Sequence, residues 1–69
     1  MNEQDGKFKL ALGPVEAAKA LGIGRTLLFE LLQSGDLRSF TIGSRRLIRI
    51  SDLEEFARDC ELAQRQGAR

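Results

Sequence analysis

The sequence predicts a small, mainly helical domain that carries a two-stranded β-hairpin. Three observations lead to this fold class: two short helical patterns follow each other closely, two runs of β-forming residues flank a Gly-Ser pair, and a further helical pattern comes after them. A chain of 69 residues is long enough for one domain with a small core and leaves little room for a substrate cavity.

Composition excludes several classes of protein. Hydrophobic residues make up 42% and charged residues 30%, as in a globular domain. No apolar run approaches the ~20 residues of a membrane helix, and the first residues lack the apolar segment of a signal peptide, so we expect a cytoplasmic protein without membrane contact. With no histidine and only Cys60, the chain offers no disulfide, metal site, cofactor site or catalytic group, and we expect that it is not an enzyme.

The charges are distributed unevenly along the chain, although the net charge is only +1. Residues 25 to 49 hold five arginines against Glu30 and Asp36, whereas residues 50 to 69 hold five carboxylates against three arginines. A basic middle segment indicates an anionic partner on one face of the protein. A solvated basic face that binds nothing is the alternative.

The first helix is predicted over residues Pro14–Leu21. Gly13 is its candidate N-cap, Pro14 occupies the first helical position and Gly22 follows its last residue. Small apolar residues recur along one face, so another helix can pack closely against it.

A second helix is predicted between a cap at Gly24 and a stop at Gly35, three or four residues after the first, which is helix-turn-helix spacing. Leu28, Leu31 and Leu32 form its apolar stripe. A face with Arg and Thr in the first turn suits the major groove of DNA, although two helices with a tight turn also occur in proteins that never bind DNA. The residues of this outward face are Arg25, Thr26, Phe29, Glu30 and Gln33.

A hairpin is predicted where the runs "LRSFTI" and "RLIRI" flank Gly43 and Ser44, which can make the tight turn. Two strands are marginal by themselves, so we expect the leucine stripe of the second helix to cover their apolar side. The apolar side chains of the hairpin are Phe40 and Ile42 in the first strand, and Ile48 and Ile50 in the second.

Four arginines lie along this hairpin. Arg45 and Arg46 directly follow the turn, and Arg38 and Arg49 lie further down the strands. Planar guanidinium groups at a protruding tip suit phosphate contact or insertion into a narrow minor groove. Protection of an edge strand by charge is the alternative.

The last helix is predicted to begin with a capping box, in which Ser51 is the N-cap and Glu54 the third helical residue, and to end near Gln64. We expect Cys60 to be a small buried side chain on the apolar face of this helix. That face consists of Leu53, Phe56, Ala57 and Cys60.

These elements set the expected boundaries of the domain. It spans residues 10 to 64, with a flexible segment at residues 1 to 9 and a frayed tail at residues 65 to 69.

The stretch from "LGPVEAAKALGIGRTLLFELLQSGDL" through "FTIGSRRLIRISDLEEFA" resembles the excisionase-family winged helix-turn-helix, a relative of the MerR-like DNA-binding domain, over roughly residues 10 to 58. The pieces "EAAKALGI", "LLQSGDL", "IGSRRLI" and "SDLEEF" match in order and spacing. The resemblance implies a small protein of a phage or integrative element that binds and bends DNA, often in adjacent copies, and biases an integrase toward excision. The second helix would enter the major groove, and the hairpin would lie as a wing along the minor groove.

The resemblance also implies roles for particular residues. Arg25 and Thr26 match the base-reading and phosphate-contacting start of the recognition helix, and Ser44, Arg45 and Arg46 match the wing tip. The full set expected to contact DNA is Arg25, Thr26, Phe29, Glu30 and Gln33 in the helix, and Ser44, Arg45, Arg46 and Arg49 in the wing.

The sequence departs from the family pattern at four of its positions. Gly24 stands where the family often has a serine, Phe29 where it often has a tyrosine, and Glu30 and Leu47 where it often has basic residues. Gly24 and Phe29 supply no side-chain hydrogen bond, and a carboxylate facing DNA costs affinity unless it accepts a hydrogen bond from a cytosine amino group. We therefore expect modest affinity for a single site.

The expected partners are double-stranded DNA, neighbouring copies of this chain on the DNA, and an integrase. Contact between the acidic last helix of one copy and the basic middle segment of the next is a hypothesis for cooperative binding. Two alternatives stay open: a transcriptional regulator with the same fold, and a protein-interaction module in which exposed Phe29 and Leu62 bind a recombinase.

Overall fold

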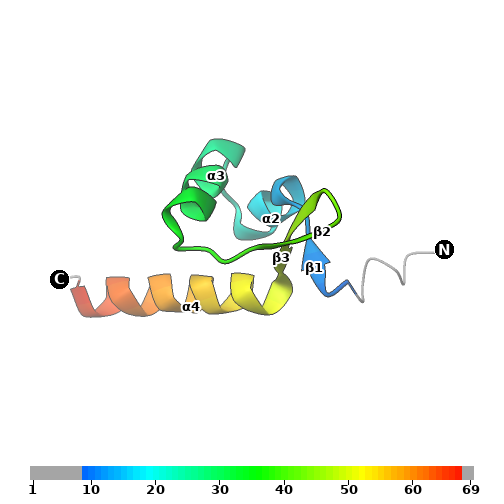
Figure 1. Cartoon of the computed structure of the whole chain (residues 1–69). Helices are drawn as coiled ribbons and strands as arrows, with labels where there is room; N and C mark the ends of the chain where they lie inside the picture. The colour runs from blue at the N-terminus through cyan, green and yellow to red at the C-terminus, as the bar shows by residue number, and fades with distance from the viewer. Residues whose placement is uncertain (1–8, 68–69) are drawn as a thin grey trace.

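The computed structural model describes residues 9–67, which form three helices and a small sheet (Figure 1). Most of the segment expected to be flexible, residues 1–8, and the last two residues of the expected tail lie outside the described residues. The elements follow in the order β1 (Ala11–Leu12), α2 (Pro14–Leu21), α3 (Arg25–Ser34), β2 (Phe40–Ile42), β3 (Arg45–Arg49) and α4 (Ile50–Gly67).

Helices α2 and α3 begin and end at the predicted residues. Pro14 occupies the start of α2, and Gly22 ends it in the left-handed region with φ 76°, where its N–H donates to the carbonyl of Lys19 at 3.1 Å. Gly35 ends α3 in the same way, with φ 86°. The helix-turn-helix prediction is confirmed, and its boundaries follow from local backbone chemistry.

The sheet has three strands where two were predicted, in the order β1-β3-β2. The additional strand, β1, pairs antiparallel with the end of β3, with Ala11 opposite Arg49 and Leu12 opposite Ile48. A strand of two residues has no periodicity of its own, so it exists only through this long-range pairing.

The predicted hairpin is confirmed, with Ile42 and Arg45 paired on either side of the Gly43-Ser44 turn. Gly43 has φ 61°, and both two-residue hairpin turns, types I′ and II′, require a positive φ at this first turn position. Because side chains alternate along a strand, the register defines two faces. The outer sheet face carries Phe40, Ile42, Arg45, Leu47 and Arg49, and the inner sheet face carries Thr41, Arg46 and Ile48.

The expectation that the leucine stripe of α3 covers the apolar side of the hairpin is correct only in part, because β3 lies mainly against α2 and α4, while Ile48 on the inner sheet face shares the core with Leu28 and Leu32. Ile48 is fully buried there, whereas Phe40 and Ile42 keep 37% and 63% of their surface exposed on the outer sheet face. The hairpin is therefore anchored to the core by one strand, and β2 has no buried residue. The core consists of Ala17, Ala18, Leu28, Leu32, Leu37, Ile48 and Leu53.

Helix α4 starts at Ile50, one residue before the predicted N-cap, so the predicted role of Ser51 is wrong. Strand β3 ends at Arg49 and runs into the helix without a loop, while the N–H of Ile50 donates to the carbonyl of Leu10 at 3.0 Å. Pairing with the N-terminal segment thus replaces the capping box. The helix also continues to Gly67, beyond the expected end.

The apolar face of α4 is buried only near its start. Leu53 is buried and Phe56 half-buried, but Ala57 and Cys60 are exposed. The prediction of a buried Cys60 is wrong because the helix extends past the body of the domain, so its second half has little to pack against (Figure 1).

Candidate nucleic-acid interface

Helix α3 presents a polar face with one aromatic side chain to solvent. All five residues predicted for this face are exposed, and Phe29 retains 45% of its surface. On the other side of the helix, Leu28 and Leu32 are buried in the core. The residues of the exposed face are Arg25, Thr26, Phe29, Glu30 and Gln33.

Helix α2 supports α3 from behind with small side chains. Ala17 is fully buried and Ala18 is 2% exposed, so the two helices can approach closely. Gly24 is the N-cap of α3; its backbone is extended, and it has no side chain that could cap the helix. The first backbone N–H groups of α3 therefore have no partner within the helix and can donate to a phosphate.

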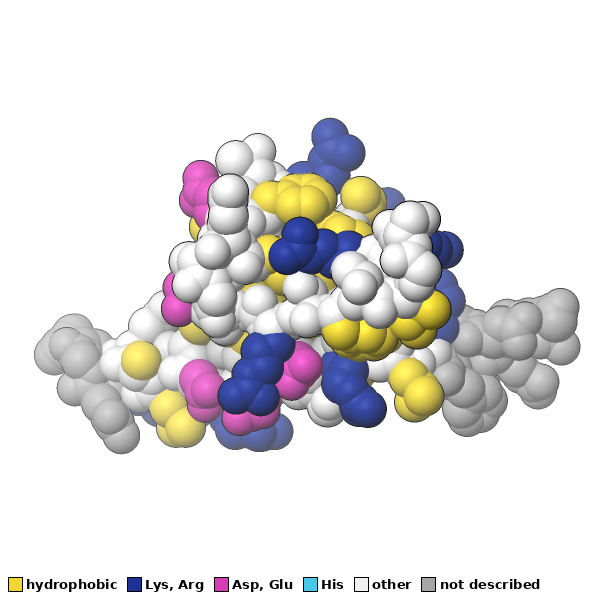
Figure 2. Space-filling view, viewed as in Figure 1, with side chains coloured by type: hydrophobic (Ala, Val, Ile, Leu, Met, Phe, Trp, Pro, Cys, Tyr) yellow, Lys and Arg dark blue, Asp and Glu magenta, His cyan; other side chains and the backbone are white. Residues whose placement is uncertain are grey.

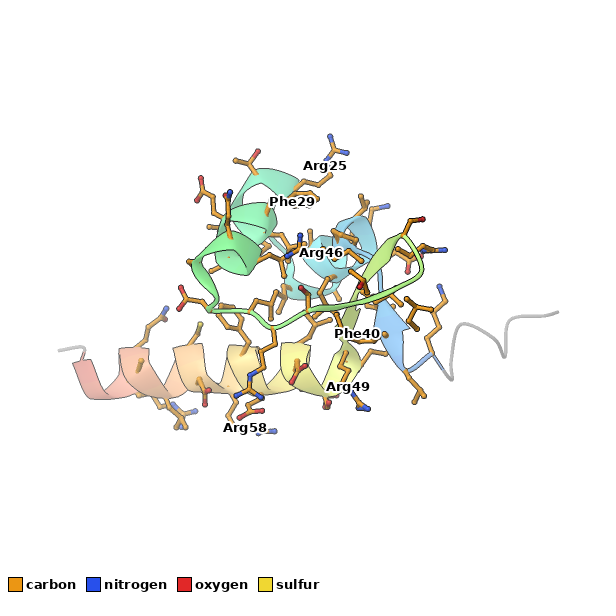
Figure 3. The ribbon with its side chains drawn as sticks, viewed as in Figure 1. Arg25, Phe29, Phe40, Arg46, Arg49 and Arg58 are labelled. Atoms are coloured by element: carbon orange, nitrogen blue, oxygen red, sulfur yellow. The ribbon has the colours of Figure 1, made fainter. Side chains whose placement is uncertain are left out.

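The adjacent residues Arg45 and Arg46 do not lie on the same surface. Adjacent residues of a strand point to opposite faces, so Arg46 lies on the inner sheet face and Arg45 on the outer. Figure 3 shows the Arg46 side chain extending from the hairpin toward α3, whereas Phe40 and Arg49 lie on the side toward α4. Arg46 thus lies on the surface between α3 and the hairpin.

Ser39 holds Arg46 in this place. The Nε–H of Arg46 donates to Oγ of Ser39 at 3.1 Å. This bond uses one donor of the guanidinium and leaves both terminal NH₂ groups for a ligand. The sequence contains no local signal for the contact, since it joins residues on either side of the turn that meet only when the strands pair.

Arg45 lies beside the start of α2. A Cβ atom on Gly13 would stand 3.8 Å from its Nη2 atom, so the guanidinium passes close to this turn of backbone. Lys9 and Glu16 form an ion pair nearby, with Nζ and Oε1 3.2 Å apart. Ser44 is exposed in the turn, as expected for a wing tip.

The predicted binding residues therefore divide into two groups. The α3 face and Arg46 lie around one side of the molecule, with Arg25 and Phe29 close to the hairpin side of α3 in Figure 3. Arg45 and Arg49 belong to the outer sheet face, and Ser44 joins the two faces at the tip. The sequence identified all these residues as exposed but did not predict their division.

The described part of the chain has no grouping of three or more His, Cys, Asp or Glu side chains arranged to hold a metal ion. Among the helices of that part, none has the length and apolar character needed to cross a membrane.

Comparison with known proteins gives one family and one curated relative. Residues 11–61 match the helix-turn-helix domain family. A probable excisionase from Saccharopolyspora erythraea is 43% identical over 42 residues, which are 61% of this chain and 43% of that protein. The match thus spans less than half the length of the relative. No solved structure matches the chain.

Proposed function

Because the chain belongs to the helix-turn-helix domain family, we propose that it is an excisionase-like protein that binds and bends double-stranded DNA through α3 and the hairpin. The observation that carries this proposal is the exposed face of α3 with the Arg46 side chain beside it. Arg25, Thr26, Gln33 and Arg46 can donate hydrogen bonds from this surface, and α2 packs against α3 behind it. The similarity to a protein named a probable excisionase supports the same function.

In this proposal α3 lies in the major groove. Arg25 in the first turn reaches a base edge, and a bidentate pair with guanine gives about 1 to 3 kcal/mol of discrimination. Thr26 and the free N–H groups of the first turn contact phosphate, while Gln33 extends the reading along the groove. Glu30 accepts a hydrogen bond from a cytosine amino group, and Phe29 contacts the sugar wall or a thymine methyl group.

The hairpin is the wing of the complex. Ser44 and Arg45 at the tip follow the minor groove, whose negative potential attracts guanidinium groups. Arg46 binds the phosphates between the helix and the wing, because it lies between these two elements. Phosphate contacts of this kind position the protein, whereas the contacts of α3 provide sequence specificity.

The DNA would bend so that one small protein can contact the major groove with α3 and the minor groove with the hairpin. A bend of 40 to 90° costs on the order of 1 to 6 kcal/mol, which one copy with few contacts offsets only in part. We propose that neighbouring copies share this cost and that the bent DNA favours excision by an integrase. The protein acts by binding and shaping DNA rather than by catalysis.

The test starts from selection of binding sites out of a random duplex library, followed by fluorescence anisotropy on the selected duplex and on an unrelated one. Arg25→Ala should remove most of the preference for the selected sequence. Lys19→Ala is the matched control, since it removes one exposed positive charge from α2 outside the proposed surface. Equal losses in the two variants would contradict the assignment of α3, and unchanged energy transfer between dyes at the duplex ends would contradict bending.

A further inference from the structure

The outer sheet face is an exposed apolar surface of which the DNA-binding proposal uses only Arg45 at the tip. Ile42 keeps 63% and Phe40 37% of its surface exposed, and Leu10 beside them keeps 81%. Leu10, Ile42 and Leu47 line one open groove together with Arg45. Figure 2 shows this apolar surface below the hairpin, away from the α3 side.

Two arginines border this surface. Arg45 and Arg49 are exposed, and neither takes part in the ion pairs formed among residues 9–67. Aromatic side chains and arginine are both enriched in protein interfaces, and the outer sheet face carries Phe40 together with Arg45 and Arg49. Leaving such a surface in water is unfavourable, and a partner that covers its apolar area stabilises the complex.

A surface of opposite character lies on α4 of the same molecule. Asp52, Glu55, Asp59 and Leu62 follow at intervals of three or four residues, so they share one side of the helix. Leu62 keeps 43% of its surface exposed. We call these four residues the acidic side of α4.

Nearby basic residues reduce the negative charge of the acidic side of α4 without cancelling it. Arg38 lines the shallow depression in which Asp36, Asp52, Glu55 and Asp59 meet, so four carboxylates there face one guanidinium. Arg58 lies further along α4 in the same view (Figure 3). Net negative charge remains, and it complements the net positive charge of Arg45 and Arg49.

The two surfaces lie next to each other on one face of the molecule, as Figure 2 shows. A face that carries both halves of a complementary pair can match a second copy of itself after a twofold rotation, which makes each contact twice. We propose that two copies of the chain pair in this way, with the outer sheet face of each on the acidic side of α4 of the other. The pair is closed, so copies assemble in twos.

A second copy fits this surface better than other occupants. Phosphates of DNA would match Arg45 and Arg49 but would leave the apolar side chains of Phe40 and Ile42 without a partner. The acidic side of α4 offers carboxylates for the arginines and Leu62 for the apolar groove. Because α3 and Arg46 lie elsewhere, the pair leaves them free for DNA, whereas Arg45 at the tip borders both surfaces. The inference goes beyond the proposed function and is tested without DNA.

The test is a charge exchange measured by sedimentation equilibrium of the full chain without DNA. Arg49→Glu and Glu55→Arg should each weaken self-association at least tenfold. Each variant brings side chains of like charge together across the interface, and the twofold symmetry repeats this repulsion at a second place. An equimolar mixture of the two variants, and the double variant, should recover association, since opposite charges then face each other again. Lys19→Glu is the control outside the surface.

The outcomes decide between the alternatives. A wild-type chain that stays monomeric over the whole concentration range overturns the inference, as does association that all variants share equally. Far-UV circular dichroism of each variant confirms its fold, and Ile42→Ser provides a second probe that weakens the pair without changing charge. Binding of the wild-type chain to a duplex with a single selected site reports on the proposed function separately, so failure of one proposal is distinguishable from failure of the other.

Discussion

Replacing Arg46 by alanine should weaken DNA binding more than replacing Arg45, although the two residues are adjacent. The Nε–H of Arg46 is bonded to Ser39, which orients the guanidinium and leaves its two terminal NH₂ groups for a phosphate of the proposed complex. Hydrogen bonds to a charged group contribute about 1.5 to 3 kcal/mol, which corresponds to a loss of roughly 10-fold to 150-fold in affinity. Loss of one phosphate contact should also lower the salt slope by about 0.9.

Arg45 should contribute less because it lies on the outer sheet face. An exposed charge without a fixed partner contributes at most about 1 kcal/mol, or about fivefold in affinity. Fluorescence anisotropy on a selected duplex at several salt concentrations gives both the affinity and the slope for each variant. An Arg45→Ala loss equal to or greater than the Arg46→Ala loss, or an unchanged slope for Arg46→Ala, would refute the division of the hairpin into two faces.

Three further predictions concern single residues. Ser39→Ala should lower DNA affinity by roughly threefold to tenfold, the value of one hydrogen bond, without changing the salt slope. Ser39→Thr keeps the hydroxyl and should restore the affinity. A changed slope for Ser39→Ala would show that Ser39 itself contacts a phosphate. Ile48→Ala should lower the free energy of unfolding by about 2 to 5 kcal/mol, because the side chain is fully buried between the sheet and the helices. Urea unfolding followed by circular dichroism measures this loss. The whole free energy of unfolding of a domain of this size is about 3 to 10 kcal/mol. Gly43→Ala should cost about 1 to 2 kcal/mol in the same assay, because its φ of 61° is unfavourable for any residue with a Cβ; no change would mean that the turn relaxes to another conformation.

The helix-turn-helix could be predicted from the sequence because its signals are local. Pro14, Gly22 and Gly35 each act on the backbone within a few residues, so their effects do not depend on the rest of the fold. The family resemblance and the match over residues 11–61 agree with this reading. The exposed face of α3 could be predicted for the same reason, since helical periodicity alone separates it from the buried leucines.

The features that the sequence did not reveal depend on distant pairing. Strand β1 exists because two residues meet the end of β3, and the same segment accepts the N–H of Ile50, which displaces the capping box at Ser51. The exposure of Cys60 depends on where the body of the domain ends, which no periodicity of α4 encodes. Ser39 and Arg46 likewise meet only after the strands pair.

The direct passage from β3 into α4 makes the wing and the last helix one mechanical unit. With Arg49 ending the strand and Ile50 beginning the helix, no loop exists at which one could rotate without the other, and the bond from Ile50 to Leu10 braces the junction. A partner that tilts α4 must therefore tilt the hairpin as well. In the proposed complex, whatever holds the far half of α4 would therefore also set part of the angle at which the hairpin meets the DNA.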